Sequence, residues 1–122
     1  MKELIRKHHI SFKNALAGLK WALYTQPNFR VHLLAAILVM ILGQIVSLSR
    51  NEWILLIFTI ICVLAAEMIN TSLEAMTDLI TQEWHQDAKI AKDVAAGMML
   101  LVAIGSIFIG GFIFIPKLLT WF

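Results

Sequence analysis

Three long apolar segments constrain this chain more than any other feature of its sequence. Residues 33–49 and 94–116 contain no charged side chain, and fourteen uncharged residues run from Trp53 to Ala66. A helix needs about 20 mostly apolar residues to cross a bilayer. With 60% hydrophobic residues and a mean hydropathy of +0.81 over 122 residues, the chain is too apolar for a soluble protein of this size. We expect an all-α integral membrane protein, one domain over residues 1–122, whose three spans cover about residues 29–49, 53–77 and 93–116.

The segment before these spans, about residues 2–24, has the pattern of an amphipathic helix on the membrane surface. Its apolar residues favour one helical face, and five basic side chains are available for the other. Pro27 bars continuation of this helix and suits the first turn of the next one. After the first span, residues 49–52 predict a short polar hairpin in which Asn51 caps the second span's helix.

The distribution of basic residues predicts the orientation. Three spans place the two termini on opposite sides of the membrane. With the N-terminus inside, eight Lys and Arg residues are cytoplasmic and only Arg50 and Lys117 are outside, as the positive-inside rule requires. We therefore expect a multi-pass protein of the bacterial cytoplasmic membrane. A net charge of +2, without a basic run interleaved with aromatic residues, gives no support to nucleic-acid binding.

One polar stripe interrupts the second span. Glu67, Asn70, Glu74 and Asp78 have spacings that place them together on one side of a helix. An ionisable side chain at membrane depth is costly, which makes Glu67 a functional-site candidate. The second span must continue past Ala66 to cross the bilayer, so we expect Glu67 and Asn70 near one membrane boundary. Glu74 and Asp78 would then lie in water, on the cytoplasmic face.

The order of residues in this region resembles a known family. Six of the eight acidic residues fall between positions 67 and 93. The pattern reads Glu67-x-x-Asn70-x-x-x-Glu74-x-x-x-Asp78, then His85, then Ala88-Lys89-x-Ala91-Lys92-Asp93. It is similar to the signature of the small prokaryotic lipid kinases, the diacylglycerol kinase and undecaprenol kinase family. The element Asn28-Phe29-Arg30-x-His32 looks more like the undecaprenol kinase branch.

The resemblance implies a kinase that uses ATP and Mg2+ to phosphorylate the hydroxyl of a membrane lipid. Undecaprenol is the expected lipid, and diacylglycerol is the nearest alternative. The resemblance also implies a homotrimeric bundle with active sites shared between neighbours. It assigns the catalytic role to Glu67 and the metal to Glu74 and Gln26. The positions it assigns to cofactor binding are Asn14, Gln26, Asn70, Glu74, Glu83, Trp84, His85, Lys92 and Asp93.

The side chains support these roles on chemical grounds. The sequence has no G-x-x-x-x-G-K-[ST] loop, so any nucleotide clamp must come from helix side chains. Glu67 is the carboxylate nearest the lipid and suits a base for a lipid hydroxyl. Glu74 suits a hard cation such as Mg2+. Lys92 and Asp93 are expected to open the third span's helix, whose N-terminus would favour phosphate.

One position departs from the family pattern and keeps alternatives open. Gln26 stands where the family usually has a second metal-ligating carboxylate, and a glutamine brings a carbonyl oxygen but no negative charge. The chain could therefore be a non-catalytic relative that binds lipid or nucleotide. It could also be a small oligomeric transporter that uses Glu67 as a cation or proton relay. Asp78 suits a structural pair with a lysine as well as it suits the site, and His32 is expected to be an ordinary hydrogen-bonded boundary residue.

Overall fold

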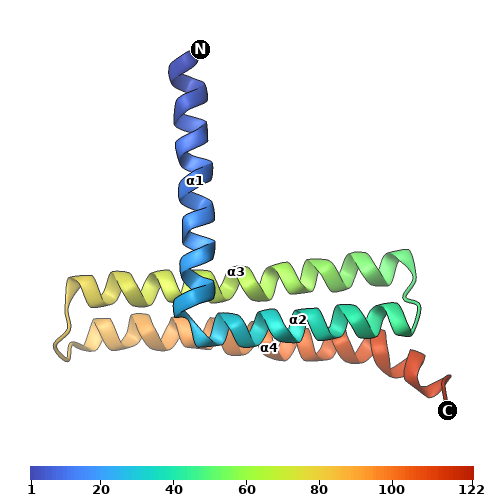
Figure 1. Ribbon diagram of the computed structural model, residues 1–122. Helices are drawn as coiled ribbons and strands as arrows, with labels where there is room; N and C mark the ends of the chain where they lie inside the picture. The colour runs from blue at the N-terminus through green and yellow to red at the C-terminus, as the bar shows by residue number, and fades with distance from the viewer.

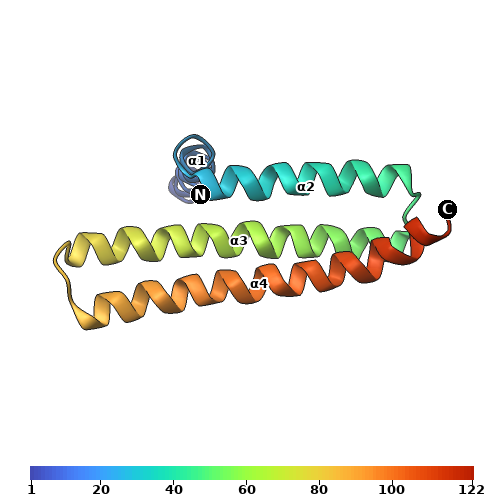
Figure 2. The same ribbon diagram turned by 90° about the horizontal axis from the view of Figure 1, so that it is seen from below.

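The computed structural model describes all of residues 1–122 and is entirely helical. The helices are α1 (Lys2–Thr25), α2 (Pro27–Ile45), α3 (Arg50–Ile80) and α4 (Gln86–Leu119). Helices α2, α3 and α4 run side by side, with α3 antiparallel to both α2 and α4, and α1 runs crosswise to them (Figures 1 and 2). Three of these helices are long and apolar enough to cross a membrane. The expected all-α membrane architecture is confirmed, while the surface position of α1 stays a prediction.

The junction between α1 and α2 is a single residue. Gln26 has an extended backbone, with φ −103° and ψ 106°, and Pro27 occupies the first turn of α2, as the sequence predicted. A proline there lacks only an N–H that the helix start would leave unpaired. Ala22 and Phe29 on either side of this junction are buried. The chain therefore turns sharply where α1 leaves the bundle (Figure 1).

Helices α3 and α4 are longer than a bilayer requires. At 31 and 34 residues they measure about 46 and 51 Å, against a hydrocarbon core of about 30 Å. Figure 2 shows that the α3–α4 pair extends past the start of α2 toward the connection at 81–85. The uncharged part of α4 is residues 94–116. Charged residues at both ends of these helices therefore lie beyond the membrane core.

The start of α4 corrects one expectation. The helix begins at Gln86, where the imidazole Nδ1 of His85 accepts a hydrogen bond from the backbone N–H of Asp87 at 3.2 Å. Lys92 and Asp93 consequently lie in the second turn and do not open the helix. The field of a helix N-terminus falls off within the first turn. The prediction that the helix N-terminus favours phosphate binding at Lys92 and Asp93 is therefore wrong.

The turn between α2 and α3 also differs from expectation in one residue. Ser49, and not Asn51, caps α3: its hydroxyl accepts from the N–H of Glu52 at 3.3 Å, while the Glu52 carboxylate accepts from the N–H of Ser49 at 2.7 Å. This reciprocal capping box satisfies two backbone donors at once, which a cap at Asn51 would not do. Ser47 takes a left-handed conformation with φ 55° to close the turn.

The hydrophobic core lies at this same end of the bundle. Its buried cluster consists of Val46, Leu48, Leu56, Ile113 and Phe114. Elsewhere the bundle is thin, because at most 22% of the most apolar window of any spanning helix is buried. Most of the apolar surface must therefore be covered by lipid or by other chains.

Candidate active site

Two polar side chains of α3 are buried inside the bundle. Glu67 is 4% exposed and Asn70 is 9% exposed. The Nε2 atom of His32, on α2, lies 4.0 Å from the Oε2 atom of Glu67, which is longer than a hydrogen bond. A buried carboxylate needs a polar partner, and His32 is the basic side chain closest to it. His32 thus belongs to the site, which the sequence alone did not indicate.

Asn70 carries an unsatisfied acceptor. Its Oδ1 atom is fully buried and has no hydrogen-bond partner. Leaving such an atom unpaired costs roughly 1–3 kcal/mol, so a donor or a cation at this position would be stabilised. Asn70 lies one helical turn from Glu67 on one side and from Glu74 on the other. The unpaired Oδ1 atom therefore lies in the middle of the carboxylate stripe.

The stripe continues toward water. Glu74 is exposed, and Asp78 accepts a hydrogen bond from the Lys92 Nζ atom at 2.6 Å. Glu67 and Asp78 are eleven residues apart on α3, which corresponds to about 16 Å along the helix axis. The stripe thus connects a buried carboxylate inside the bundle with exposed groups near residues 81–85.

A polar cavity lies at that end of the α3–α4 pair. Its volume is about 370 Å³, and it is lined by residues from the end of α3, the 81–85 connection and the first turns of α4. The structure thereby brings together five of the predicted cofactor-binding residues: Glu83, Trp84, His85, Lys92 and Asp93. Asp78 and Lys89 line the same cavity. Sequence reasoning did not single out Lys89, although its place in the Ala-Lys repeat was visible.

Ion pairs hold both lysines of this cavity. The hydrogen bond to Asp78 raises the pKa of Lys92 above its ordinary value, partial desolvation opposes the shift, and the charges of Asp78 and Glu74 add to it. Lys89 pairs with Asp93 one turn further along the same helix. Both pairs are exposed, so they exchange readily with other partners. An incoming phosphate would meet a charged Lys92 that a carboxylate already positions.

Four predicted cofactor-binding residues do not line this cavity: Asn70 and Glu74 belong to the stripe on α3, and Asn14 and Gln26 lie on α1 and at its junction with α2. Asn14 is exposed on α1 and does not line it. The Gln26 side chain donates through Nε2 to the hydroxyl of Thr25 at 3.2 Å. No three His, Cys, Asp or Glu side chains are close enough to hold a metal ion by themselves. The position of Gln26 along the bundle is nevertheless informative. It precedes His32 by six residues, so the antiparallel register set by His32 and Glu67 puts it level with the turn that contains Glu74.

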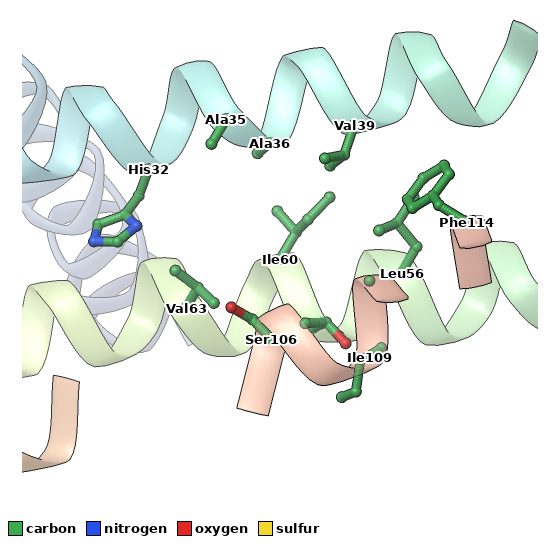
Figure 3. A pocket seen from close by; sticks show the side chains of 12 residues that line it. His32, Ala35, Ala36, Val39, Leu56, Ile60, Val63, Ser106, Ile109 and Phe114 are labelled. Atoms are coloured by element: carbon green, nitrogen blue, oxygen red, sulfur yellow. The ribbon is translucent and has the colours of Figure 1, made fainter. Parts of the chain in front are cut away.

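A second cavity lies in the apolar part of the bundle, between α2, α3 and α4. Its volume is about 160 Å³. Figure 3 shows His32 at one end of it and Leu56 and Phe114 at the other, with Val63 and Ser106 between them. This cavity opens beside the histidine that faces Glu67. A space for apolar groups therefore adjoins the buried carboxylate.

Comparison with known proteins identifies the family. The model of the family described as prokaryotic diacylglycerol kinase matches residues 13–114. This chain belongs to the prokaryotic diacylglycerol kinase family. It is 42% identical over 108 residues to an undecaprenol kinase of Bacillus subtilis, and the match covers 88% of each chain. The predicted family and the predicted enzyme class, a lipid kinase, are confirmed.

Two further relatives are also similar to this chain. A diacylglycerol kinase of Synechocystis is 39% identical over 112 residues, which cover 91% of this chain but only 64% of that protein. A diacylglycerol kinase of Escherichia coli strain K12 is 28% identical over 87 residues, covering 71% of each chain. The matched region, 13–114, contains all the candidate residues from Asn14 to Asp93.

Proposed function

We propose that this protein transfers the terminal phosphoryl group of ATP, with Mg2+, to the hydroxyl of undecaprenol at the cytoplasmic face of the bacterial inner membrane. Diacylglycerol is the alternative acceptor. One observation carries the proposal. The buried Glu67 belongs to a stripe of oxygen side chains that leads to a polar cavity containing Lys92. The names of the Bacillus and Synechocystis relatives support the two candidate lipids.

Each part of the stripe has a role in this reaction. Glu67 accepts the proton of the lipid hydroxyl as its oxygen attacks the terminal phosphorus, and ADP leaves with the bridging oxygen. Asn70 orients the reacting groups through its unpaired Oδ1 and its amide N–H groups. Lys92, held by Asp78, neutralises phosphate oxygens. The lipid hydroxyl approaches from the bilayer and the nucleotide from water, so one helix joins both substrates.

The side chains near Glu74 fit a Mg2+ ion that arrives with the nucleotide. Mg2+ is usually held by one or two carboxylates together with phosphate oxygens and waters, so a cluster of three acids is not needed. Glu74 offers an exposed carboxylate, and Gln26 lies level with it along the bundle. When bound, the ion would neutralise phosphate charge during transfer. With Gln26 in place of a carboxylate, we expect this chain to need a higher Mg2+ concentration for activity than a chain with a carboxylate at position 26.

Substitution at Gln26 tests the metal assignment. Gln26→Glu restores a negative charge level with Glu74 along the bundle, and we expect the Mg2+ concentration for half-maximal activity to fall several-fold. Gln26→Ala removes the oxygen ligand and should raise that concentration. Both variants are compared with wild type in a Mg2+ titration at saturating ATP. Identical Mg2+ curves for all three proteins would remove Gln26 from the metal site.

We also propose that the active protein is a homotrimer. The thin bundle leaves most of its apolar surface open, and Asn14 is exposed on a helix that runs crosswise to the bundle (Figure 1). A neighbouring copy would cover part of that surface, and α1 would bring Asn14 toward the site of that neighbour. Cross-linking in bilayers should give a three-subunit limit. A monomer that is fully active would contradict this arrangement.

A lipid-panel assay tests the main proposal. Purified protein in bilayers is given labelled ATP with undecaprenol, diacylglycerol or no lipid, with and without Mg2+. We expect Mg2+-dependent label on undecaprenol and little hydrolysis of ATP without a lipid alcohol. If neither lipid becomes labelled under any Mg2+ concentration, the proposed function is wrong.

A further inference from the structure

The apolar cavity beside His32 is long and narrow. On α3 its lining residues run from Val63 back to Leu56, seven residues that correspond to about 10 Å along the bundle axis. Its volume is about 160 Å³, close to that of an engineered cavity of about 150 Å³ that binds benzene. The cavity therefore has room for one slender apolar group of five or six carbons, aligned along the bundle.

The polar atoms around the cavity are nearly all engaged. The Thr59 hydroxyl donates to the carbonyl of Leu55 at 2.8 Å, and the Ser106 hydroxyl donates to the carbonyl of Ala103 at 2.8 Å. The remaining polar lining side chain is His32, at one end of the cavity (Figure 3). Its Nε2 atom is the one that lies 4.0 Å from Glu67 Oε2. An acceptor atom of a guest can thus find a hydrogen-bond donor at that end only. Along the rest of the cavity, any carbonyl oxygen would be buried without a donor.

We propose that this cavity holds the first isoprene unit of a polyprenol, with its hydroxyl between His32 and Glu67. This inference rests on the proposed lipid kinase function. A polyprenol has a single polar group, its terminal hydroxyl, and a five-carbon repeat that matches the volume. Diacylglycerol carries two ester groups close to its hydroxyl, and burying their carbonyl oxygens here would leave them unpaired. The cavity selects the polyprenol over the diacylglycerol.

Filling the cavity tests this selection. Gly110 lines it, and a Cβ atom added there meets no other atom within 4 Å. Gly110→Leu therefore adds a side chain without a backbone clash. Gly105, on the same helix, has equally free space but does not line the cavity, so Gly105→Leu is the matched control. We expect Gly110→Leu to lower kcat/KM for undecaprenol by about tenfold or more, with the KM for ATP unchanged and Gly105→Leu close to wild type.

A photolabelling experiment without ATP tests binding in the cavity separately from phosphoryl transfer. A polyprenol with a diazirine on its first isoprene unit is photolysed with the protein in bilayers without ATP, and the labelled peptides are sequenced. We expect label on residues 35–39 and 106–110, loss of that label in Gly110→Leu but not in Gly105→Leu, and protection by undecaprenol but not by diacylglycerol.

The possible outcomes distinguish the two proposals. Label outside the cavity, or label lost equally in both leucine variants, would overturn the assignment of the cavity. If the cavity is labelled but wild type phosphorylates no lipid alcohol, the proposed function fails while the polyprenol site stands. If wild type phosphorylates undecaprenol and Gly110→Leu matches Gly105→Leu, the function stands and the cavity assignment fails.

Discussion

At the 46–49 end of the bundle, buried apolar side chains and a capping box hold the helices together. At the 81–85 end, by contrast, the ends of two helices line a polar cavity that is open to solvent. The first end contains the apolar core cluster, and Gly43 packs closely against Leu48 and Trp53. Near the second end the contacts between α3 and α4 include the exposed ion pair of Asp78 with Lys92. Glu67 and Asn70 are buried between the two ends.

Along α3 and α4, the residues that stabilise the fold and the residues proposed to act in catalysis thus lie in different places. Apolar burial and capping contribute most to stability, and they concentrate where no residue of the carboxylate stripe or the polar cavity lies. Exposed ion pairs contribute little to stability and can rearrange when a nucleotide binds. Segments with few buried contacts open at the lowest free-energy cost. We expect substitutions at the 46–49 end to change stability, and those in the stripe and the polar cavity to change catalysis.

The largest expected effect is on turnover. Glu67→Gln keeps the shape of the side chain but removes its basicity, so we expect kcat to fall by about 10²–10⁴-fold while the thermal unfolding midpoint does not fall. Glu52→Gln, at the other end of the same helix, is the matched control and should keep wild-type kcat. The lipid-panel assay and thermal unfolding in detergent provide both measurements. If Glu67→Gln keeps wild-type turnover, the assignment of catalysis to the stripe is wrong.

A smaller effect is expected on nucleotide binding. Lys92→Met removes the charge that Asp78 positions in the polar cavity, and we expect the KM for ATP to rise by about tenfold or more. Lys89→Met should have a smaller effect, because Lys89 pairs with Asp93 on its own helix. ATP titrations at fixed lipid concentration compare the two variants. Equal KM values for both would show that the cavity does not distinguish its two lysines.

Stability should respond most at Gly43. A Cβ atom there would lie 2.9 Å from Leu48 Cδ1 and 3.0 Å from Trp53 Cη2, closer than packed atoms tolerate. We expect Gly43→Ala to lower the free energy of unfolding by about 1–3 kcal/mol relative to Gly105→Ala, whose Cβ meets nothing. Unfolding in detergent measures this difference, and kcat should match in both variants. A Gly43→Ala protein as stable as Gly105→Ala would mean that this end repacks easily.

The smallest effect is the response to pH, which should have opposite signs at the two ends. The backbone N–H of Ser49 lowers the pKa of Glu52 below its ordinary 4.5, burial opposes this, and Lys117 at 3.2 Å assists it. A carboxylate with a lowered pKa stabilises the fold above that ordinary value, and this contribution is lost as the pH falls through the lowered pKa. Lys92 has a raised pKa, so the stability that comes from its own charge is lost as the pH rises through that raised pKa.

Thermal unfolding at a series of acidic pH values measures how the contribution of Glu52 to stability depends on pH. The difference in unfolding midpoint between wild type and Glu52→Gln should be present at neutral pH and shrink below pH 4.5. Gly43→Ala serves as the control, because its difference from wild type arises from close packing and should not shrink in that range. A Glu52→Gln difference that persists at the lowest pH would show that the capping interaction does not depend on charge.

Local patterns were enough to predict much of this protein. Uncharged segments of sufficient length predicted the spanning helices, and Pro27 predicted the break before the first of them, because both depend on neighbouring residues only. The spacing from Glu67 to Asp78 predicted one face of one helix for the same reason. The family resemblance depended on residue order, which the sequence displays directly.

Contacts between distant residues were decided by the tertiary structure alone. His32 and Glu67 are 35 positions apart, and Lys92 and Asp78 are 14 apart, so their pairing depends on the register between helices, which no local period encodes. The choice of Ser49 over Asn51 as cap was local, because Ser49-x-x-Glu52 has the spacing of a capping box. The sequence determined that the carboxylates would form a stripe along one helix, because helical spacing is fixed. Packing determined what faces that stripe: a histidine, an apolar cavity and a lysine held by an aspartate.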